Sequence, residues 1–144
     1  MKIRQILQGK SINALYSVSS DQTVLTALEL MADKNIGAVL VVDKGALTGI
    51  FSERDYARKI VLKGRHSDDT KIADVMTANV ITIAPDQSLE ECMRIMSDKH
   101  IRHLPVMDKG ELVGIISIND VVTAIIRDQK TRIDSLESYI SGTY

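Results

Sequence analysis

The chain contains one sequence pattern twice. Residues 17–61 align without gaps on residues 82–126 when the sequence is moved along itself by 65 positions. The aligned blocks include LMADKNI with IMSDKHI, and VVDKGALTGI with VMDKGELVGI. Tandem copies bury their apolar faces against each other, and the seam between them offers two clefts related by a pseudo-two-fold axis. We therefore expect any function to lie in these clefts.

The size and charge of the chain narrow the class of protein. Its 144 residues suffice for one compact domain, whereas either copy alone would be only marginally stable. The 18 basic and 19 acidic side chains leave a net charge of −1, which gives no field that attracts nucleic acid. No apolar run approaches the ~20 residues of a membrane-spanning helix, and the N-terminus lacks a signal-peptide-like apolar stretch. We expect a cytoplasmic protein that binds neither nucleic acid nor a membrane.

Hydrophobic periodicity predicts an α/β fold in which each copy has the order β-α-β-β-α. An amphipathic helix follows the Asp-Gln pair of each copy, and Ser88 with Glu91 forms a capping-box pattern at the start of the second such helix. An apolar hairpin comes next, in which Asp-Lys-Gly supplies the turn. The expected strands span 16–18, 38–42 and 47–51 in the first copy and 80–83, 104–107 and 112–116 in the second, and the closing helices begin at Ser52 and Ser117.

These elements divide the chain into four parts. We expect a first copy with a helical lead-in over 1–62, a polar linker over 63–71, a second copy over 72–127, and a helical extension over 128–144. The two copies are expected to pack as one pseudo-two-fold module. In the extension an apolar residue recurs every seven positions, which suits packing on the same domain or on a second subunit, with a dimer contact slightly favoured. The residues of this stripe are Ile126, Ile133 and Ile140, with Leu136 between the last two.

The element Gly-x-x-Ser-x-x-Asp occurs at the second strand-to-helix junction of each copy, at residues 49–55 and 114–120. Ser-x-x-Asp is itself a helix capping box. The same geometry would also serve a ligand, because the glycine lets it approach the backbone and the carboxylate can accept two hydrogen bonds from a ribose diol. Phosphate would then lie near the first-turn N–H groups of the helix. The two interpretations can coexist.

The sequence offers little for catalysis or metal binding. The three histidines, at positions 66, 100 and 103, have no second ligand at helical spacing, and the single cysteine, Cys92, falls on a predicted buried helix face. There is no P-loop, no Gly-x-Ser-x-Gly nucleophile elbow and no Asp-rich calcium loop. We therefore expect no enzyme activity, no bound metal and no obligatory cofactor.

The two aligned blocks, DQTVLTALELMADKNIGAVLVVDKGALTGIFSERD and DQSLEECMRIMSDKHIRHLPVMDKGELVGIISIND, resemble a tandem pair of cystathionine β-synthase (CBS) domains. The resemblance covers nearly the whole chain and rests on several matched blocks in each copy. The chain is similar to stand-alone bacterial proteins of this family and to the regulatory insert of inosine monophosphate dehydrogenase. The resemblance implies a regulatory module that reversibly binds an adenosine-containing ligand, such as AMP, ADP, ATP or NAD, and so senses energy or redox state.

The resemblance also implies which residues line the clefts. In each cleft the motif serine and aspartate of one copy would face the start of the other copy's hairpin, and the two clefts would differ in charge. Arg102-His103 replaces Gly37-Ala38, Arg54 stands where the second copy has Asn119, and Arg58 is near enough to be an anion ligand. The first cleft would therefore hold the tighter or more phosphorylated ligand. It would use Ser52 and Asp55 with Arg102, His103 and Leu104, and its twin Ser117 and Asp120 with Gly37, Ala38 and Val39.

A second function class stays open from the sequence alone. The chain could be a ligand-free assembly module, in which the copies merely dimerise and Ser-x-x-Asp merely caps helices. In either case we expect a homodimer. Because no effector domain is visible in the sequence, signal transduction would reach an effector protein in trans or another subunit.

Overall fold

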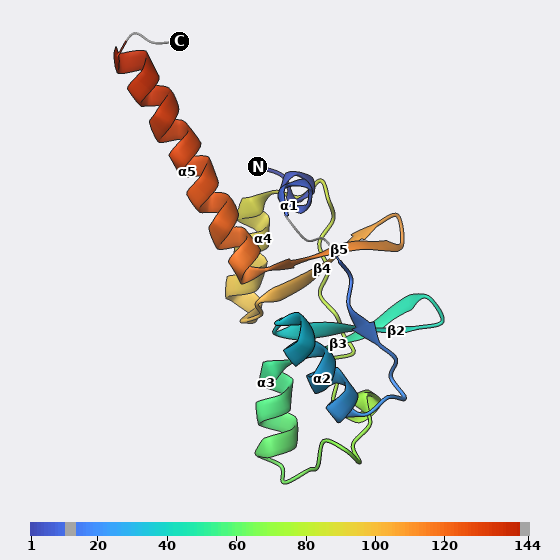
Figure 1. Ribbon diagram of the computed structural model, residues 1–144. Coiled ribbons are helices and arrows are strands. Elements are labelled where there is room, and N and C mark those ends of the chain that lie inside the picture. Colours follow the sequence, from blue (N-terminus) through green and yellow to red (C-terminus); the bar gives the residue numbers. More distant parts are fainter. Residues whose placement is uncertain (11–13, 142–144) are drawn as a thin grey trace.

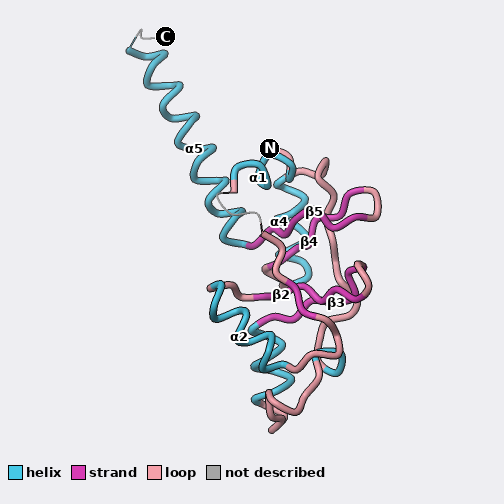
Figure 2. The backbone as a smooth tube through the Cα atoms, turned by 45° about the vertical axis from the view of Figure 1, so that its right-hand side comes forward, coloured by secondary structure: helices cyan, strands magenta, loops and turns pink. Residues whose placement is uncertain are grey.

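The computed structural model describes residues 1–10 and 14–141. Two halves lie one above the other, and the last helix projects beyond the upper half (Figure 1). Figure 2 shows that each half combines helices with a strand hairpin, as expected of an α/β fold. The lower half contains β1 (Ser17–Val18), α2 (Val24–Lys34), β2 (Ala38–Asp43), β3 (Ala46–Ser52) and α3 (Glu53–Asp55), which continues as a π-helical stretch over Tyr56–Val61. The upper half contains α1 (Ile3–Gly9), α4 (Leu89–Lys99), β4 (His103–Asp108), β5 (Glu111–Ser117) and α5 (Ile118–Ser141).

The predicted hairpins are present, and their turns are tighter than the sequence pattern suggested. β2 pairs with β3, and β4 with β5, in antiparallel register. Lys44 and Gly45 both have positive φ, at 51° and 79°, and Lys109 and Gly110 repeat this at 52° and 81°. Two adjacent positive φ angles are typical of a type I′ turn. The aspartate that precedes each Lys-Gly pair is therefore the last strand residue and not a turn residue.

The strand expected over 80–83 is wrong, because this run makes only one isolated parallel bridge, between Ile83 and Val106. In the first copy the equivalent strand β1 is extended by a bond of 3.1 Å from the Leu40 N–H to the Tyr16 carbonyl. The residue aligned with Leu40 is Pro105, which has no N–H to donate. The second copy therefore loses the ladder bond that would make its opening segment a strand.

Each copy is preceded by a short lead-in, residues 1–10 before the first copy and residues 72–77 before the second, and each lead-in packs on the half formed by the other copy. The N-terminal helix α1 hydrogen-bonds to the segment that begins α4, through Ile3 N to the Gln87 carbonyl and Leu89 N to the Met1 carbonyl, both at 2.9 Å. A 3-10 turn over Ile72–Asp74 makes the matching bond to the first copy, from Ile72 N to the Gln22 carbonyl at 2.9 Å. Each copy is thus completed by the lead-in that precedes its twin in the chain.

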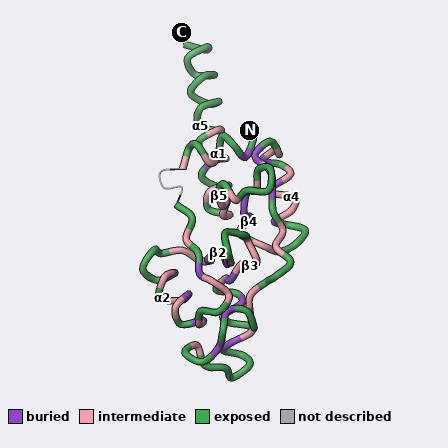
Figure 3. Tube along the Cα trace, turned by 90° about the vertical axis from the view of Figure 1, so that its right-hand side faces the viewer, coloured by how far each residue is buried: buried purple, intermediate pink, exposed green. Residues whose placement is uncertain are grey.

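Two separate hydrophobic clusters reflect this exchange, and buried segments lie inside both halves in Figure 3. The cluster of the first copy includes Ile72 and Val75 from the second lead-in. The cluster of the second copy includes Ile3 and Ile6 from α1. It also contains Cys92, which is fully buried as predicted, and burial raises the pKa of its thiol to about 11. Cys92 is therefore a protonated core residue.

Among the described residues, the last helix, α5, has its buried side chains near its beginning. Val121 and Ala124 are buried against the second copy, whereas the side chains from residue 129 to residue 141 are exposed. The helix is continuous through residue 127, where the sequence suggested a boundary between the second copy and an extension. In the described part of the chain, no helix combines the length and the apolar character needed to cross a membrane.

The glycine of the first motif makes room for the exchanged second lead-in. Ile50 and Thr77 exchange backbone hydrogen bonds of 3.0 and 2.9 Å beside Gly49. A Cβ atom on Gly49 would lie 2.6 Å from the Met76 Sδ atom and 3.1 Å from the Thr77 carbonyl oxygen. The Met76 side chain can move aside, whereas the Thr77 carbonyl belongs to the paired backbone, so the close approach of these two segments favours glycine.

We predict that Gly49→Ala lowers the free energy of unfolding by roughly 1–3 kcal/mol, because the added methyl group overpacks the junction between the two copies. Urea denaturation of the full chain measures this change. Gly9→Ala is the matched control, because the nearest atom to its new Cβ would be the flexible end of Arg127 at 3.9 Å. Equal stability of the Gly49→Ala variant and the wild type would contradict the packing argument.

Candidate ligand-binding site

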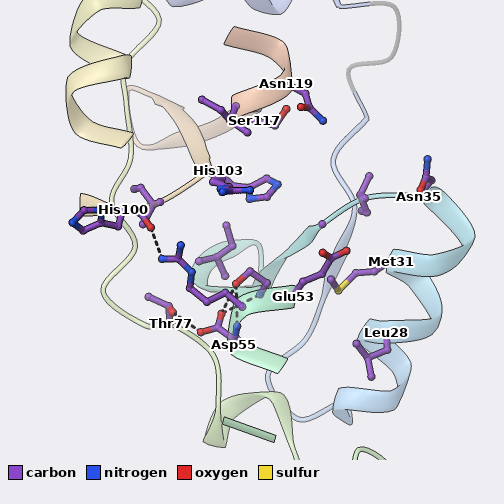
Figure 4. Close-up of a pocket in the computed structure, with 18 of the residues that line it drawn as sticks. Leu28, Met31, Asn35, Glu53, Asp55, Thr77, His100, His103, Ser117 and Asn119 are labelled. Atoms are coloured by element: carbon purple, nitrogen blue, oxygen red, sulfur yellow. Dashed lines mark hydrogen bonds between the residues drawn. The ribbon is translucent and has the colours of Figure 1, made fainter. Parts of the chain in front are cut away.

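A cavity of ≈ 800 Å³ lies between the two copies and is lined by residues of both. Figure 4 shows Asp55 and Thr77 on one side of it and His103, Ser117 and Asn119 on the other. Helix α2 supplies an apolar wall through Leu28 and Met31. Of the residues expected in the clefts, the cavity is lined by Gly37, Ser52, Arg54, Asp55, Arg102, His103, Ser117 and Asn119.

The first motif forms the capping box that the sequence predicted. The Ser52 Oγ accepts from the Asp55 N–H at 3.3 Å, and the Asp55 Oδ2 accepts from the Ser52 N–H at 3.0 Å. The other carboxylate oxygen, Oδ1, accepts from the Thr77 hydroxyl at 3.3 Å and pairs with Lys59 Nζ at 3.0 Å. Because each carboxylate oxygen has two acceptor positions, a ligand hydroxyl would have to share Asp55 with these donors.

The second motif is capped in the same way, and its serine lines the same cavity, but its aspartate lines a different one. The Asp120 Oδ2 accepts from the Ser117 N–H at 2.8 Å, and it also pairs with Lys10 Nζ at 3.0 Å. Lys10 donates a further bond of 2.8 Å to the Ile115 carbonyl. Asp120 lines a smaller cavity of ≈ 310 Å³ between α1 and α5, together with Lys10 and Arg127. Asp120 and Asp55 thus line separate cavities, and the Lys10 ammonium pairs with Asp120.

Three residues expected at the clefts are parts of the core. Ala38, Val39 and Leu104 lie in β2 and β4 and are 5%, 1% and 0% exposed. The sequence marked them as strand starts, and strands buried on both faces leave no side chain for a cavity. Arg58, which the sequence placed near the first cleft, is an exposed residue of the π-helical stretch and does not line the cavity.

One of the basic residues that line the cavity, His103, differs in charge from what the sequence predicted. Arg102 is an exposed guanidinium at the cavity wall, and Arg54 donates to the backbone carbonyl of His100. Burial lowers the pKa of His103, although the negative charges of Asp120 and Glu53 oppose this shift. His103 is therefore neutral near pH 7 and does not provide the second positive charge expected beside Arg102.

Sequence reasoning missed part of the cavity wall. Leu28 and Met31 were assigned to the packing face of a helix, and nothing in their spacing separates a core face from a cavity face. His100 ends α4 with a φ of 55°, in the left-handed region, which turns the chain toward β4. Thr77 reaches Asp55 because of the lead-in exchange. In the described ranges 1–10 and 14–141, no cluster of three or more His, Cys, Asp or Glu side chains could hold a metal ion.

Comparison with known sequences identifies the pattern. The family model described as the CBS domain matches residues 10–62 and 72–127. The mitochondrial CBS domain-containing protein CBSX3 of Arabidopsis thaliana is 39% identical over 143 residues, which cover 95% of this chain and 69% of that protein. The CBS domain-containing protein YhcV of Bacillus subtilis is 36% identical over 105 residues, covering 73% of this chain and 74% of that protein.

Solved structures show the same arrangement of the chain. A protein with CBS domains from Burkholderia ambifaria superposes with a TM-score of 0.86 at 47% identity, over 90% of this chain and 96% of that one. The CBS domain pair of protein MJ0100, solved in complex with 5′-methylthioadenosine and S-adenosyl-L-methionine, superposes with a TM-score of 0.78 at 25% identity. That match covers 89% of this chain and 98% of that one.

The depressed pKa of His103 predicts a pH dependence of stability. Between the ordinary value of 6.5 and the lower value in the folded protein, the unfolded chain binds a proton that the folded protein does not. The free energy of unfolding should therefore be fully maintained above pH 6.5 and fall as the pH drops below it. Urea denaturation at pH values on either side of 6.5 should show a smaller loss for His103→Gln than for the wild type. An identical loss in both proteins would contradict this assignment.

Proposed function

We propose that this chain, which belongs to the CBS-domain family as a pair of CBS repeats, regulates a partner by reversibly binding one adenosine-containing nucleotide between its repeats. The CBS pair is a regulatory module, and the proposal specifies its ligand as AMP, ADP, ATP or NAD. Its site is the larger cavity, which contains Asp55 and Arg102. A change in which nucleotide occupies the cavity would then report the energy or redox state of the cell.

The observation that carries the proposal is the combination of groups around this cavity. Asp55 is held in place at a helix start, where its carboxylate can accept from a ribose hydroxyl. Arg102 provides a guanidinium at the cavity wall, and a guanidinium can pair with a phosphate in a bidentate manner. Leu28 and Met31 provide the apolar surface that a planar base requires. A hydrogen-bond acceptor for the sugar, a charged hydrogen-bond donor for the phosphate and an apolar wall for the base together match the parts of a nucleotide.

The ligands of a relative support the adenosine class. The CBS pair of MJ0100 was solved with 5′-methylthioadenosine and S-adenosyl-L-methionine, and both of these ligands contain adenosine. The match between that CBS pair and this chain covers 98% of the MJ0100 chain at 25% identity. An adenosine ligand is thus compatible with the shared fold, and the guanidinium of Arg102 favours a phosphorylated one in this chain.

The two aspartates are unequal in this proposal, for a reason that the sequence did not provide. Lys10 neutralises Asp120 at 3.0 Å and also uses the Ile115 carbonyl, so the second position is filled by the protein itself. Asp55 has an analogous partner in Lys59, which also donates to a backbone carbonyl, that of Val75, at 2.9 Å. The two lysines differ in exposure, because the side chain of Lys59 is 41% exposed and that of Lys10 is 16% exposed. Lys59 can therefore turn into solvent when a ligand binds at smaller cost than Lys10.

The regulatory output would pass through protein contacts. We propose a cytoplasmic homodimer without enzyme activity of its own, which acts on an effector protein in trans. The rival function is a ligand-free assembly module. The specific observation in its favour is that both motif aspartates already serve as helix caps and ion-pair partners.

The site assignment is tested by titration calorimetry of the full chain with AMP, ADP, ATP and NAD. We expect Arg102→Ala to weaken binding of the preferred nucleotide by roughly ten- to a hundredfold, because a hydrogen bond to a charged group contributes about 1.5–3 kcal/mol. Asp55→Asn, which keeps an acceptor for the helix cap, should weaken the same event. The matched control is Arg58→Ala, an exposed arginine outside the cavity, which should bind as the wild type does. The nucleotide should be recovered unchanged after incubation.

If Asp55→Asn and Arg102→Ala both bind every nucleotide with wild-type affinity, the aspartates are only caps and the assembly module replaces the proposal. A thermal-shift screen gives an independent readout, because a ligand at ~100 times its dissociation constant adds about 2.7 kcal/mol to stability. Absence of any shift with all four nucleotides would also contradict the proposal.

The asymmetry between the aspartates makes a separate prediction. Removing the Lys10 amine should free Asp120, so Lys10→Met should add a second, weaker nucleotide-binding event to the titration. The combined variant Lys10→Met/Asp120→Asn should lose this second event and keep the first. A single event of unchanged stoichiometry in Lys10→Met would show that Lys10 does not block the second position.

A further inference from the structure

Helix α5 carries an apolar stripe that nothing in the described part of the chain covers. The helix leaves the body after its first turns and points away from it in Figures 1 and 2. At a rise of about 1.5 Å per residue its 24 residues span about 36 Å. The apolar members of the stripe are between 47% and 82% exposed. These apolar residues are Val122, Ile126, Ile133, Leu136 and Ile140. Gln129 is the one polar residue of the stripe.

The spacing of this stripe is that of a two-stranded coiled coil. Its members alternate at intervals of three and four residues, which places Ile126, Ile133 and Ile140 at heptad position a. Position d is occupied by Val122, Gln129 and Leu136. β-branched residues at a with leucine at d favour dimers, and here all three a residues are isoleucine while Leu136 is the one leucine at d. Val121 and Ala124, which hold α5 to the body, lie on a different face of the helix, so the stripe stays accessible along its whole length.

We propose that this stripe is the seam of a parallel, in-register coiled coil with α5 of a second copy of this chain. The inference goes beyond nucleotide binding, and it specifies the geometry of the homodimer that the proposed function assumes. Two details of the stripe, one polar and one charged, favour this occupant and this orientation.

The polar detail is Gln129 in the middle of the stripe. In a parallel, in-register pair Gln129 faces Gln129 of the second copy, and the two amides can hydrogen-bond to each other. In the antiparallel pair that keeps the same apolar layers, Gln129 faces Ile133 instead. A buried amide without a partner costs about 1–3 kcal/mol. A foreign helix would need a matching polar residue at this layer, whereas a second copy supplies it by symmetry.

The charged detail is the pair Arg132 and Glu137, which flank the seam at positions g and e. A parallel coil brings Arg132 of one copy beside Glu137 of the other, twice by symmetry. The antiparallel coil would place Arg132 against Arg132 instead. Arg132 is 3.3 Å from Asp128 within its own helix, and both side chains are exposed, so this pair offers little resistance to a change of partner.

Cysteine cross-linking of the full chain tests orientation and register together. In a parallel, in-register coil, position 133 faces its own counterpart, so Ile133→Cys should form a disulfide-linked dimer under mild oxidation. The wild type is the control, because its single cysteine, Cys92, is fully buried. Failure of Ile133→Cys to cross-link at concentrations where the wild type is dimeric would overturn the proposal.

Sedimentation of surface variants tests the energetics. Ile133→Lys should raise the dimer dissociation constant by more than about a hundredfold, because it buries two charges in the seam and removes two apolar side chains. Ser135→Lys, on the opposite face of α5, is the matched control and should leave the constant unchanged. Arg132→Glu should weaken the dimer, and Arg132→Glu/Glu137→Arg should restore it, which an antiparallel coil would not allow. A monomeric wild type, or a double variant that stays weak, would overturn the proposal.

This inference and the proposed function can fail separately. Residue 133 lies outside the cavity, so Ile133→Lys should still bind the nucleotide of the wild type. Nucleotide binding by a protein that shows none of the expected dimer behaviour would overturn the coiled coil alone. A cross-linked Ile133→Cys dimer that binds no adenine nucleotide would overturn the proposed ligand alone.

Discussion

The exchange of lead-ins holds the two copies together, and the rest of the structure depends on it. Each copy has its own hydrophobic cluster, and no buried residue belongs to both. The clusters are joined because Ile3 and Ile6 enter the second and Ile72 and Val75 enter the first. Burying one such side chain contributes about 1.5–3 kcal/mol. The two copies therefore cannot separate without opening both cores, and this fixes the cavity between them.

The same exchange makes the two motifs different. The lead-in that enters the first copy brings the Thr77 hydroxyl to Asp55 at 3.3 Å. The lead-in that enters the second copy brings the Lys10 ammonium to Asp120 at 3.0 Å. Asp55 thus receives a neutral donor from the opposite lead-in and its ammonium from Lys59 of its own copy, whereas Asp120 receives its ammonium from the opposite lead-in. The asymmetry of the site arises from two short segments outside the repeated sequence.

The sequence predicted what depends on neighbouring residues and missed what depends on distant ones. The two hairpins, the helix starts at Ser52 and Ser117, and the buried Cys92 all follow from local pattern and were confirmed. The strand over 80–83 was wrong because Pro105, in the strand beside it, has no N–H to donate, and Pro105 lies 22 positions beyond Ile83 in the chain. Lys10 lies before the repeat begins, so aligning the copies could not reveal it. The neutral state of His103 depends on burial, which periodicity does not measure.

One continuous helix joins the wall of the cavity to the far end of the molecule. The α5 helix begins immediately after Ser117, which lines the cavity, and runs without interruption to Ser141. Such a helix acts as a lever. Over a length of about 36 Å, a tilt of about 5° at its base moves its tip by about 3 Å. Tilting that small is within the range of adjustments that packed helices make at interfaces. If the cavity binds a ligand as proposed, a small tilt on binding would displace the far end of α5, at a place that the ligand itself does not reach.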